Sequence, residues 1–320
     1  MVMEYILFII GIYLLVNCAD FIVDSSSSLA RKLGVSTLII GMTIVAFGTT
    51  LPELIVNLFS IINGSSEVAF GNITGSFIAN ILLILGITAI FGVVRIRVST
   101  VWHLIPFALM SVFLLFLLVN KSLFGIGVDF LYRIDGLILL SFLVIYLYFI
   151  FQSIKHEKGD ESILLKIRDL SNLKIYLKLF LGFIGIIVGG RLVVNGAIFV
   201  ASQLGVSEFL ISATIIAVGT SLPELSVCIR ALMKNKIDLA VGDIIGSNIF
   251  NILWVLGIVP VIKPLRIPTF INFDIAVMFF AALIIFIFMF TGPRHELRRR
   301  DGFILVILYL LYIIYIIIRG

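Results

Sequence analysis

The stretch GMTIVAFGTTLPELIVN, residues 41–57, returns as SATIIAVGTSLPELSVC, residues 212–228, with 10 of 17 positions identical. A second stretch, EVAFGNITGSFIANILLILG at residues 67–86, returns as DLAVGDIIGSNIFNILWVLG at residues 238–257, with 11 of 20 identical. The offset is 171 residues in both cases. The shared positions include Thr, Glu, Ser and Asn, which an apolar membrane span does not need. A repeat that keeps its polar residues predicts a site built from both halves of the chain.

The composition is that of a membrane protein. The chain is 61% hydrophobic and only 13% charged, against roughly 25% charged residues in ordinary soluble domains. Stretches of about 20 apolar residues can cross the roughly 30 Å of hydrocarbon in a bilayer. Such stretches lie at residues 3–27, 37–62, 67–91, 100–119, 131–154, 174–202, 209–233, 238–259, 269–291 and 301–318. They predict an all-α integral membrane protein with ten transmembrane helices, five in each half.

The two halves are expected to be inverted. Equivalent points of the two copies are five helices apart, and an odd number makes the second copy enter the membrane from the opposite side. We predict an N-terminal five-helix repeat at residues 1–154, a cytoplasmic linker at 155–173 and an inverted C-terminal five-helix repeat at 174–320. Broken helices 2 and 3 of one half, and 7 and 8 of the other, then form the core.

Loop charges predict the orientation, because Lys and Arg concentrate on the cytoplasmic side. Of the 23 basic residues, 16 lie in or beside loops that follow odd-numbered helices. We therefore expect a multi-pass protein of the cell (inner or plasma) membrane with both termini extracellular. The same bias accounts for a pI near 9.2, so the basic charge does not call for a nucleic-acid partner.

Each copy contains the run Gly-Thr-Thr/Ser-Leu-Pro-Glu, at residues 48–53 and 219–224. Proline has no N–H and its ring displaces the carbonyl four residues earlier, so Pro52 and Pro223 should open their helices. Hydroxyls accompany each break, from Thr49, Thr50, Thr220 and Ser221. The alternative is a simple proline kink, which explains the break but not the glutamate that follows it.

Glu53 and Glu224 are carboxylates inside apolar spans. An unpaired charge near the bilayer centre costs at least about 2.5 kcal/mol, so each glutamate needs a cation, a proton or a basic partner. Arg230 is expected to extend to the membrane surface. A pair between Arg191 and an acidic residue of the first helix is left open, with Asp20 or Asp24. The glutamates are then expected to face mobile cations or protons.

The second shared element is G-x-x-x-G-S-x-x-x-N. Glycines four apart permit close helix approach, and Ser and Asn four apart can offer a hydroxyl and an amide oxygen to one point. The alternative is that these residues only pack and bridge helices. The element occurs as Gly71, Gly75, Ser76 and Asn80, and again as Gly242, Gly246, Ser247 and Asn251. Together with the glutamates these are oxygen donors, which suit hard cations such as Ca²⁺ or Na⁺.

GTTLPEL and GTSLPEL, followed by GNITGSFIAN and GDIIGSNIFN, resemble the two alpha-repeats of the cation/calcium antiporter superfamily, in particular its prokaryotic sodium/calcium exchanger branch. The resemblance implies a secondary antiporter that exchanges about three Na⁺ for one Ca²⁺ by alternating access, with the first and sixth helices sliding across the core. The implied metal ligands are Glu53, Glu224, Thr49, Thr50, Thr220, Ser221, Ser76, Ser247, Asn80, Asn251, and the carbonyls of Ala46 and Ala217.

The chain departs from the family pattern at one place. Some relatives carry Asp at one of the positions of Asn80 and Asn251, whereas here both are Asn. We therefore expect two formal negative charges at the centre, which one Ca²⁺ would neutralise. The two copies also differ from each other, with Thr50 against Ser221 and Asn72 against Asp243.

Other functions are compatible with parts of this pattern. An H⁺/Ca²⁺ antiporter on the same fold would discharge the glutamates with protons alone. An intramembrane hydrolase would need a nucleophile and two carboxylates in unlike surroundings, which the repeat does not supply. A passive channel is disfavoured because inverted symmetry suits alternating access. We predict a non-enzymatic Na⁺/Ca²⁺ antiporter in the lipid bilayer that needs no cofactor, binds no nucleic acid and is functional as a monomer. The sequence leaves its protein partners open.

Overall fold

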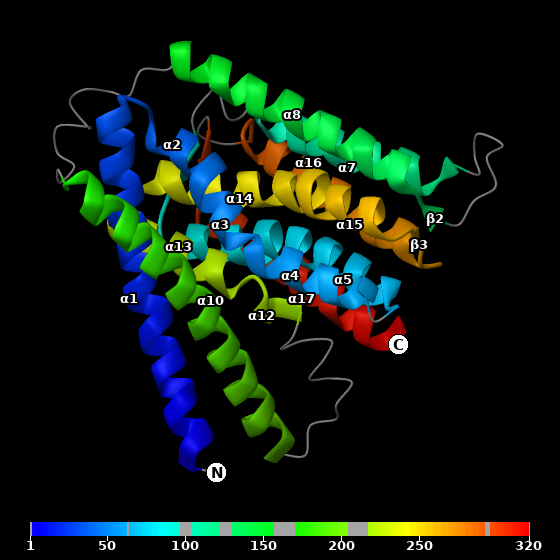
Figure 1. Cartoon of the computed structure of the whole chain (residues 1–320), viewed down its shortest axis with the longest axis horizontal. Coiled ribbons are helices and arrows are strands. Elements are labelled where there is room, and N and C mark those ends of the chain that lie inside the picture. Colours follow the sequence, from blue (N-terminus) through cyan, green and yellow to red (C-terminus); the bar gives the residue numbers. More distant parts are fainter. Residues whose placement is uncertain are drawn as a thin grey trace.

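The computed structural model describes residues 2–62, 64–96, 104–121, 130–156, 170–203, 217–291 and 295–319, and these form a bundle of helices (Figure 1). Within these described residues, eight helical stretches are long and apolar enough to cross a membrane. They are Met3–Leu33, Thr37–Ile62, Ser66–Phe91, Arg133–Gln152, Asn172–Val200, Ile237–Ile262, Ile271–Phe288 and Arg299–Arg319. Ile105–Val119 is a shorter apolar helix, and residues 209–216 of the predicted seventh span lie outside the described residues. The all-α membrane fold is confirmed.

In the first half, the chain forms five helical segments. They are α1 (Val2–Leu33); α2 (Thr37–Ile40), η1 (Gly41–Val45), α3 (Ala46–Thr49) and α4 (Leu51–Ile62); α5 (Ser66–Ile78), η2 (Ala79–Leu85) and α6 (Gly86–Phe91); α7 (Ile105–Val119); and α8 (Arg133–His156). The η segments are π-helical.

The second half repeats this order. Its elements are α10 (Asn172–Gln203); α12 (Ala217–Gly219) and α13 (Leu222–Met233); α14 (Ile237–Phe250), η6 (Asn251–Val255) and α15 (Leu256–Ile262); α16 (Ile271–Phe288); and α17 (Arg299–Arg319). Two short antiparallel strand pairs join the halves at their loops. They are β1 (Val94–Arg95) with β4 (Glu296–Leu297), and β2 (Phe130–Leu131) with β3 (Leu265–Arg266).

The predicted breaks take two forms. The second and seventh helices are interrupted by turns, at Thr50 in one half and at Thr220 and Ser221 in the other, just before the prolines that remove a backbone donor. The third and eighth helices stay continuous but become π-helical at η2 and η6. Single π-helical turns are frequent at functional sites because they rotate the following side chains.

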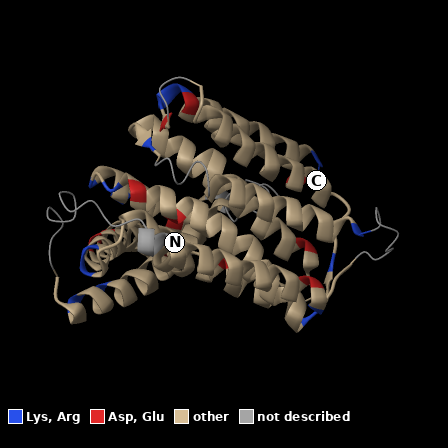
Figure 2. Cartoon of the chain, turned by 90° about the horizontal axis from the view of Figure 1, so that it is seen from above, with Lys and Arg blue, Asp and Glu red and all other residues tan. Residues whose placement is uncertain are grey.

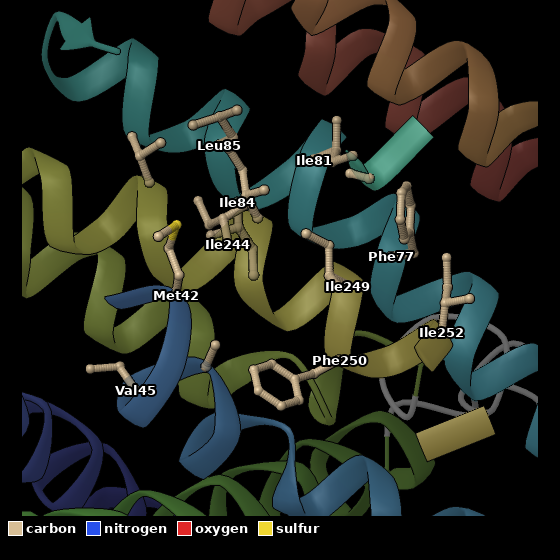
Figure 3. Packing of buried hydrophobic residues seen from close by; sticks show 14 of the residues in the cluster. Met42, Val45, Phe77, Ile81, Ile84, Leu85, Ile244, Ile249, Phe250 and Ile252 are labelled. Atoms are coloured by element: carbon tan, nitrogen blue, oxygen red, sulfur yellow. The ribbon is translucent and has the colours of Figure 1, made fainter. Parts of the chain in front are cut away.

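The repeat helices form the centre of the bundle. In the most apolar 18-residue window of Ile237–Ile262, 83% of residues are buried, and the value for Ser66–Phe91 is 78%, against 28% for Arg299–Arg319. Figure 3 shows α14 between η1 on one side and α5 with η2 on the other. The contact is made by Met42, Val45, Phe77, Ile81, Ile84, Leu85, Ile244, Ile249 and Phe250. This packing holds the polar residues of both repeats next to one another.

The halves interlock through their fifth helices. A Cβ on Gly136 of α8 would lie 2.4 Å from the carbonyl oxygen of Gly257, and one on Gly302 of α17 would lie 2.6 Å from that of Gly86. Gly86 and Gly257 are equivalent positions of the two repeats, so each fifth helix packs on the other half. The two halves therefore share one core. Most of the linker, residues 157–169, lies outside the described residues.

α1 and α10 lie side by side and project from the core (Figure 1). Each has 32 residues. Their crossing is close: a Cβ on Gly11 would lie 2.9 Å from the carbonyl oxygen of Gly189, and one on Gly189 would lie 3.0 Å from that of Gly11. These are the first and sixth helices of the sequence, and they form a pair distinct from the repeat core.

Candidate cation-binding site

The two glutamates are fully buried at the breaks of their helices. Glu53 lies in the first turn of α4 and Glu224 in the first turn of α13, and both are 0% exposed. The N-terminus of a helix carries unpaired N–H groups and the positive end of the helix dipole, which favours a carboxylate there. The break before each proline therefore places each glutamate at the start of a new helix in the middle of the fold.

Hydroxyl groups of the two halves pair across the centre. Thr49 Oγ1 lies 3.2 Å from Ser247 Oγ, and Thr220 Oγ1 lies 3.3 Å from Ser76 Oγ. Because Thr49 matches Thr220 and Ser76 matches Ser247 at the offset of 171, these are the same contact made twice with the halves exchanged. Ser76 Oγ also lies 3.4 Å from Glu53 Oε1. The structure thus joins the first repeat element of each half to the second element of the other.

The remaining predicted hydroxyl and carbonyl ligands lie along the same breaks. The Ala46 carbonyl accepts hydrogen bonds from the Thr50 amide (3.1 Å) and from Thr50 Oγ1 (2.8 Å). Its lone pairs are therefore engaged by the chain itself in this conformation. Ser221 Oγ is buried and makes no hydrogen bond among the described residues, while Ala217 begins α12.

Buried polar atoms without hydrogen bonds gather at this centre. Within the described structure they include Glu53 Oε2, both carboxylate oxygens of Glu224, Asp243 Oδ2, Asn80 Oδ1, Ser221 Oγ, and both polar atoms of Asn57 and Asn251. Leaving one such group unmatched costs about 1–3 kcal/mol, and more if it is charged. Their concentration around two carboxylates is the chemistry of a site for hard cations, which bind through several oxygen ligands.

The two asparagines of the shared motif have different surroundings. Asn80 Nδ2 donates to Asn248 Oδ1 at 3.0 Å. Asn248 stands where the first repeat has Phe77, and Asn251 makes no side-chain hydrogen bond among the described residues. Sequence reasoning did not single out Asn248, although the mismatch between GSFIAN and GSNIFN was visible.

A third carboxylate joins the two glutamates. Asp243 is 0% exposed, and its Oδ1 accepts hydrogen bonds from Thr49 Oγ1 at 3.0 Å and from Ser247 Oγ at 3.4 Å. The expectation of two formal negative charges at the centre is wrong, because Asp243 lies one helical turn before Ser247 and on the same face of α14. The only sequence signal was the mismatch with Asn72.

The basic residues near the glutamates are engaged elsewhere. Arg230 forms an ion pair that the sequence did not predict: its Nε donates to Asp20 Oδ1 at 2.9 Å. Lys234 Nζ lies 2.7 Å from both Asp20 and Asp24. The pair left open between Arg191 and these aspartates is not formed, and Arg191 is exposed. Among the described residues, no basic side chain forms an ion pair with Glu53, Glu224 or Asp243.

Charge is distributed accordingly over the whole bundle. Most of the described Lys and Arg residues lie at or near the ends of helices, while some of the acidic residues lie inside (Figure 2); Arg191 is an exception, within α10. A cavity of about 800 Å³ between α4 and α10 approaches the centre and is lined in part by Pro52, Arg191, Thr220 and Pro223. Its lining includes Thr220, one of the four residues whose hydroxyls pair across the centre.

Comparison with known proteins settles the family. The sequence model described as "Sodium/calcium exchanger protein" matches residues 3–152 and 174–318. The chain belongs to this family. The exchanger is 35% identical over 317 residues to the putative antiporter CaxA of Alkalimonas amylolytica, with 97% of both chains covered. It is 29% identical over 338 residues to the sodium/calcium exchanger MaX1 of Methanosarcina acetivorans, with 96% of both covered.

The fold of the exchanger has also been solved in a relative. Structures of the sodium-calcium exchanger NCX_Mj, soaked with Na⁺ and with Ca²⁺ or Sr²⁺, align with TM-scores of about 0.8; one has a TM-score of 0.81 at 31% identity and covers 98% of both chains. The predictions of a multi-pass membrane protein, of cation/Ca²⁺ exchange and of a transporter rather than an enzyme are confirmed. One chain contributes both halves of the site, which is consistent with a monomer.

Proposed function

We propose that this exchanger moves Na⁺ against Ca²⁺ across the cell membrane, with both ions competing for the site around Glu53 and Glu224. The observation that carries the proposal is the set of buried oxygens without hydrogen bonds around carboxylates that have no basic partner among the described residues. An ion must supply the charge that the protein does not. Ca²⁺ takes six to eight oxygen ligands, and the site offers that many from carboxylates, amides and hydroxyls.

The proposed ligands are the twelve residues of the repeats. Beside the two glutamates they are Thr49, Thr50, Thr220, Ser221, Ser76, Ser247, Asn80, Asn251, and the carbonyls of Ala46 and Ala217. The neutral oxygens favour Na⁺ over H⁺ as the coupling ion, because protons would need only the carboxylates. About three Na⁺ for each Ca²⁺ is the ratio that the family resemblance implies.

Alternating access would come from the pair α1 and α10. Their contact with one another is extensive and glycine-mediated, so they can move as a unit along the repeat core. We further propose that the loops after odd-numbered helices face the cytoplasm, that both termini face outward, and that residues 155–173 form the cytoplasmic linker between the halves 1–154 and 174–320.

Flux measurements in vesicles test this function. Wild-type protein in Na⁺-loaded proteoliposomes should take up Ca²⁺ when external Na⁺ is removed. Glu53→Gln and Glu224→Gln should each abolish that uptake, because each removes a buried charge that binds the ion. Glu67→Gln is the matched control, since Glu67 is exposed in the first turn of α5, and it should exchange at the wild-type rate.

The same vesicles separate Na⁺ from H⁺ coupling. Substantial Na⁺-driven uptake by either core variant would refute the assignment of the glutamates. Ca²⁺ uptake driven by a pH gradient without Na⁺, and unaffected by a Na⁺ gradient, would replace the proposal with H⁺/Ca²⁺ antiport.

A further inference from the structure

The two repeats differ at one buried position that carries charge. Asn72 of α5 and Asp243 of α14 are equivalent at the offset of 171. Asn72 Nδ2 points back to its own half, 3.4 Å from the Glu53 backbone carbonyl. Asp243 is instead bound by hydroxyls of both halves, Thr49 and Ser247. The carboxylate therefore belongs to the shared centre, whereas its counterpart does not.

Asp243 is not neutralised by the protein around it. Its Oδ2 makes no hydrogen bond among the described residues, and neither do the two carboxylate oxygens of Glu224. Glu53 and Asp243 both lie close enough to Glu224 to repel it electrostatically when charged. Three charged carboxylates in one buried region must be neutralised by cations or protons, because burying an unpaired charge is strongly unfavourable.

The position of Asp243 distributes the negative charge of the site unevenly between the two ends of the bundle. α14 starts at Ile237, just after Lys234 and Lys236, and Asp243 comes four residues before Ser247. At 1.5 Å per residue it lies about 6 Å nearer the Lys234 end of the bundle than Ser247 does. Asn72 lies toward the opposite end, because α5 starts at the Gly64 turn and the halves are inverted. Negative charge is therefore shifted toward the Lys234 end.

We propose that Asp243, with the hydroxyls of Thr49 and Ser247 and the carboxylate of Glu224, forms an additional cation position on the Lys234 side of the central site. It takes hard cations, Na⁺ or Ca²⁺, through oxygen ligands only. The formal charge of the site becomes −3, so one bound Ca²⁺ leaves one negative charge and three Na⁺ leave none. This inference rests on the proposed exchange function and concerns how tightly, and from which side, cations bind.

Asp243→Asn tests the inference with little change in shape and gives this position the residue of the first repeat. In vesicles of defined orientation, the variant should still exchange, but its apparent affinity for Ca²⁺ and Na⁺ at the Lys234 face should fall about tenfold, equivalent to about 1.4 kcal/mol. Affinity at the opposite face should change much less. Asp243→Ser is a second variant, because serine also accepts a hydrogen bond from Thr49 but carries no charge.

The double variant Asn72→Asp with Asp243→Asn is the matched control. It keeps three carboxylates but moves one to the mirrored position. The higher cation affinity should therefore move from the Lys234 face to the opposite face. Unchanged affinity at both faces in Asp243→Asn and Asp243→Ser, with exchange intact, would overturn the inference and leave the exchange function standing. A failure of the exchange function is seen separately, as Na⁺-driven uptake that survives in Glu53→Gln or Glu224→Gln.

Discussion

Replacing Gly242 with alanine should damage both the stability and the ion affinity of the exchanger. A Cβ at this position would lie 2.5 Å from the Leu38 carbonyl oxygen and 3.0 Å from the Met42 amide nitrogen. Ordinary contacts begin near 3.4 Å, so the segment α2–η1 would have to move about 1 Å away from α14. The obstacle is backbone, and no side chain can rotate to make room. Overpacking of this kind costs about 1–3 kcal/mol, and we expect the upper part of that range.

The same displacement would reach the site. Thr49 follows η1 by one turn, and its Oγ1 lies 3.0 Å from Asp243 and 3.2 Å from Ser247, both on α14. Lengthening these distances by about 1 Å takes them beyond hydrogen-bonding range. Gly242→Ala should therefore weaken apparent Ca²⁺ affinity as well as lower the midpoint of thermal unfolding of the purified protein.

Thermal unfolding and Ca²⁺ uptake, measured on the same preparation, check this prediction. Gly190→Ala is the matched control, because its Cβ would meet only Pro223 Cδ, at 3.9 Å among the described atoms. It should behave as wild type in both assays. A Gly242→Ala protein with the wild-type unfolding midpoint and Ca²⁺ affinity would show that the helix crossing can relax, and would refute the reasoning.

Two further predictions concern the first helix and the topology. Arg230→Gln removes one basic partner of Asp20; because both side chains are about a quarter exposed, stability should fall by less than about 1 kcal/mol, while the maximal exchange rate should rise, since α1 then slides without breaking that ion pair. The rate is measured as Ca²⁺ flux at saturating Ca²⁺. A slower or unchanged rate would show that the Arg230–Asp20 ion pair does not restrain the movement of α1. For the topology, single cysteines are placed after Tyr5 and before Ile318 in a variant that lacks Cys18 and Cys228. Each should react with an impermeant maleimide added outside intact cells. Labelling only after the cells are opened would reverse the proposed orientation.

Much of the fold could be predicted because its causes are local. Pro52 and Pro223 break their helices through their own covalent structure, and the turns at Thr50 and at Thr220 and Ser221 lie where the missing donor requires them. In the third and eighth helices the sequence predicted breaks, whereas the structure has π-helical segments, η2 and η6, within continuous helices. They depend on how a continuous helix packs against its neighbours, which no short stretch of sequence records.

The candidate site was predictable in its residue types but not in its pairing. The repeat at an offset of 171 singled out Thr49, Ser76 and their counterparts, yet not that each hydroxyl meets its partner from the other half. The ion pair of Arg230 with Asp20 was not predicted, for the same reason. The distance of Arg230 from Glu224 along one helix was known, whereas the lateral approach of α1, which brings Asp20 to it, depends on tertiary packing.

The sequence by itself determined the membrane class, the duplication, the inversion of the halves, the helix breaks and the two central glutamates, because each follows from composition, periodicity or the chemistry of one residue. Only the tertiary structure decided that Asp243 is a third carboxylate of the site and that Asn248 serves one asparagine and not the other. The physical reason is that local helical geometry fixes only the direction in which a side chain leaves the axis of its own helix. What that side chain meets depends on which other helix packs there, and glycines such as Gly41 and Gly242 set that approach.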